Sequence, residues 1–223
     1  MKKITVLLIL LYSAGLLFAQ DSAKPEFSTY YYQKKSLFES LPDTKREIIF
    51  LGNSITDGGE WAELFKNEKI KNRGISGDIT DGVLYRLDEV VSSKPDKIFI
   101  MIGINDLARG KTPDYVLVNY SKILAKIKET TPGTEVYIQS VLPVNDEFGM
   151  FVNHTNKSKE IIEVNKGLKK MAVNFEYTFI DLTNTFSDSK GKLKKEFSND
   201  GLHLMGEAYL AWKSVIKKYI LSR

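Results

Sequence analysis

The chain has 223 residues, of which 43% are hydrophobic and 27% are charged, with a formal net charge of +4 at pH 7 and no cysteine. The absence of cysteine excludes disulfides and cysteine-based zinc sites. Basic residues are spread along the sequence instead of being clustered, so nothing indicates a nucleic-acid or membrane-surface partner.

The first nineteen residues have the layout of a secretory signal peptide. Lys2 and Lys3 precede an apolar stretch from Ile4 to Ala19, and polar residues follow it. We predict cleavage after Ala19. An uncleaved membrane anchor is the alternative, although the stretch is shorter than the roughly 18–20 apolar residues that span a bilayer. We therefore expect an exported bacterial protein, periplasmic or secreted, with no membrane span in its mature part.

The remainder of the chain is predicted to form one domain. Residues 20–45 combine polar and aromatic side chains and are expected to form a linker and a short helix docked on the domain. Residues 46–223 hold enough sequence for one substantial core and too little for two ordinary ones. We assign this range to a single domain.

Within residues 46–223, apolar runs alternate with amphipathic stretches. The runs are 47–51, 98–102, 136–141 and 177–182, with a weaker one at 69–73. They are continuous, as in strands covered on both faces. The helical faces that separate them comprise Ile79, Val83, Leu84, Leu87, Val90 and Val91; Val116, Tyr120, Ile123, Leu124 and Ile127; Ile161, Ile162, Leu168, Met171 and Ala172; and Ala208, Trp212, Val215, Ile216 and Tyr219. This alternation predicts a three-layer α/β/α domain with a mainly parallel, five-stranded sheet.

Polar residues follow several of the predicted strands. Ser54 comes after the first strand, Gly77 after the second and Asn105 after the third, while Asp200 and His203 lie beyond the fifth. Ligands of open parallel sheets bind beyond the carboxyl ends of the strands. Residues scattered over 150 positions are therefore expected to meet at one edge of the sheet.

These residue types suit serine acyl transfer. Ser54 would be the nucleophile, His203 the base and Asp200 the group that orients the imidazole. Structural roles are the alternatives. Ser54 would then cap a helix, Asp200 would cap the helix expected near Met205, and His203 would be a buried, hydrogen-bonded histidine.

An oxyanion hole would complete the site, because attack on an ester builds negative charge on the carbonyl oxygen. Each donor aimed at that oxygen lowers the barrier by about 3 kcal/mol. The candidate donors are the backbone N–H groups of Ser54 and Gly77 and the side-chain amide of Asn105. As structural alternatives, Gly77 is a turn glycine with positive φ and Asn105 stabilises its loop.

Four sequence blocks resemble, in order, those of the SGNH (GDSL-like) hydrolases over about residues 46–220: Gly52-Asn53-Ser54, Gly74 to Asp78, Gly103 to Asp106, and Asp200 to His203. The segment from Asn72 to Leu87 looks closest to the branch that contains the catalytic subunits of platelet-activating-factor acetylhydrolase and bacterial sugar O-acetylesterases.

The resemblance implies a flavodoxin-like fold and a mechanism without metal or cofactor. It implies a triad of Ser54, His203 and Asp200, with Ser54, Gly77 and Asn105 as oxyanion donors. One departure stands out, because the family's usual Gly-Asp-Ser is Gly-Asn-Ser here. Asn53 lacks the carboxylate, which affects the local turn or the pocket polarity and leaves the triad complete.

Other motifs give less information about function. The sequence from Gly77 to Gly82 begins like a phosphate loop but lacks the following Lys-Ser/Thr, so nucleotide binding is unsupported. Arg109 is expected either to face substrate or to lie on the surface. Further expectations are a loop position at the pocket rim for His154, turn-stabilising roles for Asp57 and Asp106, and core positions for Trp61 and Trp212.

Together these features predict an exported serine esterase that removes short acyl groups, acetyl above all, from a carbohydrate or related small ester. One alternative is a lysophospholipase or thioesterase that uses the same triad on a longer acyl chain. Another is a non-catalytic carbohydrate-binding protein of the same fold. The sequence does not indicate an oligomeric state.

Overall fold

The computed structural model describes residues 26–221, so the predicted signal peptide lies outside the described residues. Five strands form one sheet in the order β2-β1-β3-β4-β5, and every neighbouring pair is parallel. The strands are β1 (Ile48–Gly52), β2 (Ile70–Gly74), β3 (Lys97–Met101), β4 (Glu135–Gln139) and β5 (Thr178–Ile180). The predicted parallel five-stranded sheet is therefore confirmed.

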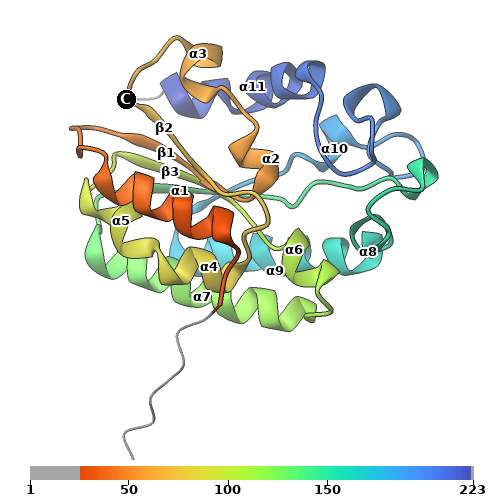
Figure 1. Ribbon diagram of the computed structural model, residues 1–223, viewed down its shortest axis with the longest axis horizontal. Coiled ribbons are helices and arrows are strands. Elements are labelled where there is room, and N and C mark those ends of the chain that lie inside the picture. The colour runs from red at the N-terminus through yellow and green to blue at the C-terminus, as the bar shows by residue number, and fades with distance from the viewer. Residues whose placement is uncertain (1–25, 222–223) are drawn as a thin grey trace, which may run out of the picture.

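Helices cover both faces of the sheet (Figure 1). Helices α3 (Trp61–Phe65) and α11 (Gly206–Leu221) lie on one side, with α10 (Thr183–Phe186) beside α11. The other side carries α4 (Thr80–Tyr85), α5 (Leu87–Ser92), α7 (Pro113–Thr130) and α9 (Ser158–Phe175). The remaining elements are α1 (Thr29–Ser40), α2 (Ser54–Asp57), α6 (Ile104–Ala108), α8 (Val152–Thr155) and the short 3₁₀ helices η1 (Asp146–Phe148) and η2 (Lys195–Phe197).

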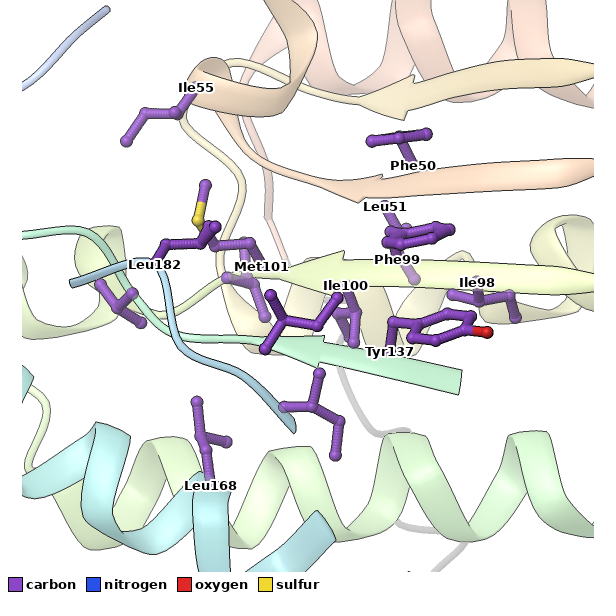
Figure 2. Packing of buried hydrophobic residues seen from close by; sticks show 14 of the residues in the cluster. Phe50, Leu51, Ile55, Ile98, Phe99, Ile100, Met101, Tyr137, Leu168 and Leu182 are labelled. Carbon is purple, nitrogen blue, oxygen red and sulfur yellow. The ribbon is translucent and has the colours of Figure 1, made fainter. Parts of the chain in front are cut away.

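A row of aromatic rings crosses the three central strands (Figure 2). Phe50 on β1 is in register with Phe99 on β3, which is in register with Tyr137 on β4. Their ring centroids are 5.0 and 4.5 Å apart, and Trp61 stacks on Phe50 at 4.3 Å. Trp61 and Trp212 are 1% and 0% exposed, which confirms their predicted core positions.

The helical stretch expected over residues 79–91 is two helices. Helix α4 ends at Tyr85 and α5 begins at Leu87, with Arg86 between them. The Arg86 side chain is buried and donates to Asp78 Oδ2 at 3.0 Å and to the carbonyl of Arg73 at 2.8 Å. The apolar periodicity continues through the break, because both short helices lie on the same side of the sheet (Figure 1) and bury their apolar residues there.

One residue of the third predicted helical face is exposed. Ile162 on α9 is 54% exposed, whereas Val164 is fully buried. Successive residues of a helix are separated by about 100°, so the face centred on Ile161, Val164 and Leu168 turns Ile162 outward. The inward face of α9 is therefore narrower than predicted.

Helix α1 packs against the loop that follows β2. Ser28 caps the helix by accepting a hydrogen bond from the N–H of Tyr31 at 3.1 Å. Tyr31 and Phe38 are buried with Ile75, and the Tyr31 hydroxyl donates to the carbonyl of Gly82 at 2.7 Å. The N-terminal segment thus braces the region between β2 and α4.

We predict that Arg86→Ala lowers the free energy of unfolding by about 3–5 kcal/mol, because it leaves the Asp78 carboxylate buried without its cation. Urea denaturation measures this change. Arg46→Ala is the matched control, since the ion pair of Arg46 with Asp96 is largely exposed and such pairs contribute about 1 kcal/mol or less. Equal losses for the two variants would contradict a stabilising role for the buried pair.

Candidate active site

Ser54 is the first residue of α2 and directly follows the tight turn that leaves β1. Asn53 caps α2 by accepting a hydrogen bond from the N–H of Ile55 at 3.1 Å. A Cβ at Gly52 would lie 2.3 Å from Thr56 Oγ1, so a side chain there would force a shift. Although Asn53 stands where the family usually has Asp, its amide oxygen still caps the start of α2.

Ser54, His203 and Asp200 form a continuous hydrogen-bonded line. Ser54 Oγ lies 3.1 Å from His203 Nε2, and His203 Nδ1 lies 2.8 Å from Asp200 Oδ2. Because the carboxylate accepts, Nδ1 carries the ring proton and Nε2 is left to accept from the serine hydroxyl. The three side chains are in the arrangement that serine acyl transfer requires.

Asp200 is held in its ionised form. Burial by itself raises the pKa of Asp200, but hydrogen bonds from the N–H of Leu202 and from the ring and N–H of His203 lower it below its ordinary value overall. The two N–H groups lie 2.8 and 2.7 Å from Asp200 Oδ1, which also accepts from Ser198 Oγ at 3.2 Å. Helix α11 begins only at Gly206, so Asp200 does not act as its cap.

Gly201 allows the chain to fold tightly between Asp200 and His203. Its φ is +85°, a left-handed conformation that favours glycine. A Cβ at this position would lie 2.1 Å from the carbonyl oxygen of Asn145. The N–H of Asn145 in turn donates to the carbonyl of Gly201 at 2.9 Å. The segment after β4 thus fixes the turn that carries the histidine.

The loop that carries Gly77 is joined directly to α6, which carries Asn105. Asn105 Nδ2 donates to the carbonyl of Asp78 at 2.8 Å. Arg109 Nη2 donates to the carbonyl of Gly77 at 2.8 Å, so this arginine braces the loop. Gly77 has a φ of +80°, as expected for a turn glycine. These contacts hold two of the candidate oxyanion donors relative to one another.

Asp57 and Asp106 stabilise the backbone on either side of Gly77, in agreement with the structural roles predicted for them. Asp106 is fully buried and accepts from the N–H and hydroxyl of Thr80, and burial raises the pKa of Asp106 to about 6. Asp57 Oδ2 accepts from the hydroxyl of Ser76 at 2.8 Å and forms an ion pair with Lys34. Asp57 thus links α2 to the loop after β2, and Asp106 links α6 to the first residue of α4.

His154 is not in a loop, contrary to the prediction. It lies on α8, and its Nε2 is 3.0 Å from Asn105 Oδ1. The ring of Phe151 contacts both histidines, with its centroid 5.0 Å from that of His203 and 5.9 Å from that of His154. Phe151 has a φ of +48°. Only the short apolar run Met150-Phe151-Val152 within a polar stretch singles it out in the sequence.

A small apolar cavity is lined by residues that include sequence neighbours of the candidate site. Ile55, Ile104 and Leu202 line it, and each adjoins a candidate site residue in sequence. Its volume is about 10 Å³, near the lower limit of the space that one water molecule occupies. The other lining residues are Asn53, Met101, Ile102, Val141, Leu142, Pro143 and Val144.

Other features of the described chain lie apart from this site. A wider groove of about 370 Å³ runs along α9 and includes Ile161, Lys166 and Phe179. Across residues 26–221, no three His, Asp or Glu side chains are grouped as potential metal ligands. No helix in that same range combines the length and apolar character needed to cross a membrane.

Comparison with known proteins shows a family match across residues 50–211, to the GDSL-like lipase/acylhydrolase family. The alpha2 subunit of platelet-activating factor acetylhydrolase IB from Rattus norvegicus is 27% identical over 173 residues, covering 75% of this chain and 72% of the relative. The corresponding alpha1 subunit from Homo sapiens is 25% identical with the same coverage.

Solved structures share the fold. A Streptococcus pneumonia protein provisionally described as a platelet activating factor superposes with a TM-score of 0.78 at 29% identity, covering 86% of this chain and 92% of its own. A GDSL-like lipase from Bacteroides thetaiotaomicron gives 0.74 at 24% identity, with 85% and 96% covered. The chain belongs to the GDSL-like lipase/acylhydrolase family and is an ester-hydrolysing enzyme.

Proposed function

We propose that the protein is a serine esterase in which Ser54 is the nucleophile, His203 the general base and Asp200 the orienting carboxylate. The observation that carries this proposal is the line from Ser54 Oγ through the His203 ring to Asp200, with contacts of 3.1 and 2.8 Å. His203 Nε2 takes the hydroxyl proton as Ser54 Oγ attacks the ester carbonyl. The imidazolium then protonates the leaving alcohol, and water clears the acyl-enzyme by the same route.

The oxyanion of the tetrahedral intermediate is held, in this proposal, by the N–H groups of Ser54 and Gly77 and by Asn105 Nδ2. Asn105 Nδ2 carries two hydrogens, of which one points to the carbonyl of Asp78. The second hydrogen is the proposed oxyanion donor. Because Asn105 is 7% exposed, its hydrogen bond to the oxyanion acts with little competition from water.

We propose a short acyl group, acetyl above all, as the group removed. In this proposal the acyl group borders Ile55, Ile104 and Leu202, the apolar residues that adjoin Ser54, Asn105 and His203 in sequence. The curated relatives are themselves named acetylhydrolases. A carbohydrate or related small ester is the proposed substrate, and an exported location is proposed with it, from the leader-like sequence alone.

One solved structure of this fold is named as an esterase of acetylated sugars. A mutant of an acetyl-xylooligosaccharide esterase from Geobacillus Stearmophilus superposes with a TM-score of 0.66, covering 82% of this chain and 98% of its own. At 17% identity this likeness concerns the fold alone. It supports the proposal only by showing that the architecture accommodates acetylated sugars in another enzyme.

A longer acyl chain is the second candidate, as in a lysophospholipase or thioesterase. It is favoured by the exposed apolar run of Met150, Phe151 and Val152, which are 49%, 42% and 61% exposed. The ring of Phe151 packs on His203, so this surface borders the proposed catalytic base. Family membership argues against the third possibility, a non-catalytic carbohydrate-binding protein.

We predict that Ser54→Ala lowers kcat/KM for p-nitrophenyl acetate by about 10⁴-fold or more, because no other group supplies the attacking oxygen. Ser76→Ala is the matched control, since Ser76 Oγ donates to Asp57 and has no proposed part in the reaction. The control should keep activity within about tenfold of the wild type. Substantial turnover by a folded Ser54→Ala variant, with an unchanged circular dichroism spectrum, would overturn the nucleophile assignment.

We also predict that Leu202→Ala shifts the preferred ester from acetate towards butyrate, because it enlarges the cavity beside His203. The ratio of kcat/KM for p-nitrophenyl butyrate to that for the acetate should rise about tenfold. Leu168→Ala removes an equally buried leucine from α9, away from the cavity, and should leave the ratio unchanged. A wild-type optimum at eight carbons or more would instead favour the long-chain candidate.

A further inference from the structure

We propose that His154 is a positioning residue that holds the carboxamide of Asn105 in the orientation needed to bind the oxyanion. The inference rests on the proposed function, because it deepens the role of Asn105 in that reaction. His154 reaches Asn105 from a separate element, α8, across 49 positions of sequence.

The orientation of the Asn105 amide follows from its two partners. The backbone carbonyl of Asp78 can only accept, so the nitrogen of the amide faces it at 2.8 Å. The amide oxygen therefore faces His154 Nε2 at 3.0 Å, and that nitrogen must carry a hydrogen to donate. A flipped amide would place oxygen against the carbonyl of Asp78, so the two contacts together select one orientation.

His154 is itself fixed in place. Its N–H donates to the carbonyl of Phe151 at 2.7 Å, and its ring packs edge-on against the Phe151 ring. Burial, followed by the nearby His203 and Arg109, lowers the pKa of His154 below its ordinary value. A neutral ring with hydrogen on Nε2 still donates to Asn105, and it places no positive charge beside His203.

The consequence is a second hydrogen-bonded line next to the first. One line runs from Ser54 through His203 to Asp200 and supplies proton transfer. The other runs from His154 to the amide of Asn105 and fixes a donor for the developing charge. Losing an oxyanion donor outright costs about 10²–10³-fold in kcat, so loosening one should cost less.

The test compares kcat and KM for p-nitrophenyl acetate between the wild type and four variants. These are His154→Ala, His154→Gln, Asn105→Ala and the double variant that combines Asn105→Ala with His154→Ala. His154→Ala should lower kcat about 10–100-fold with KM changed less than about threefold. His154→Gln should restore kcat to within about threefold, because the amide nitrogen of glutamine reaches the position of Nε2. In the Asn105→Ala background, His154→Ala should have no further effect.

Unchanged kcat in His154→Ala would overturn the inference. So would a loss of the same size in the Asn105→Ala background, or a His154→Gln variant as slow as His154→Ala. If His154→Ala does not fold, His154→Asn replaces it, because the shorter amide falls short of Asn105 and should show the same loss. A wild type that fails to hydrolyse the ester overturns the proposed function itself, whereas an active wild type with an unaffected His154→Ala overturns this inference alone.

Discussion

The parallel direction of the strands is the constraint on which the site depends. Because β1, β2 and β3 run the same way, Ser54, Gly77 and Asn105 all arrive at one edge of the sheet. The edge alone does not align them to within a hydrogen-bond length. That alignment comes from hydrogen bonds between the segments that follow the strands. The most direct of these is the contact of Asn105 Nδ2 with the carbonyl of Asp78.

Beneath these loops lies a layer of buried polar groups. Arg86 bonds Asp78 and the carbonyl of Arg73, while Asp106 bonds Thr80 on the neighbouring helix. Burying such groups is costly unless they are paired, and both Arg86 and Asp106 have charged or polar partners, although Arg86 Nη1 is buried without one. The layer fixes the backbone on either side of Gly77, and fixed donors are what the proposed oxyanion hole requires.

Much of this could be predicted from the sequence. Strands β1 and β3 are buried on both faces, which gives continuous apolar runs such as Ile48 to Leu51, whereas the edge strand β2 is only partly buried and gives a weaker pattern. Ser54 is predicted as a site residue because it follows a strand, and Asp200 and His203 because they stand together in a short Asp-Gly-Leu-His block. Their meeting in space then follows from the topology of the sheet.

The features that could not be predicted depend on contacts between residues that are distant in the sequence. Apolar periodicity indicates which face of a helix is buried. Because the periodicity continues across Arg86, it does not reveal the break between α4 and α5. The same limit applies to His154, whose partner lies on α6 and whose neighbours in sequence are polar. Phe151 packs on His203 only because the segment after β4 folds back over the site.

In the proposed reaction, Ser54 attacks an ester carbonyl while three donors hold the resulting oxyanion. A crystal structure of the protein after reaction with a methyl phosphonate ester tests it most directly, since the phosphonyl group mimics the tetrahedral intermediate. We expect phosphorus bonded to Ser54 Oγ, with one phosphonyl oxygen in hydrogen-bond contact with the N–H groups of Ser54 and Gly77 and with Asn105 Nδ2. Phosphorus on another residue, or a phosphonyl oxygen directed away from Gly77 and Asn105, would contradict it.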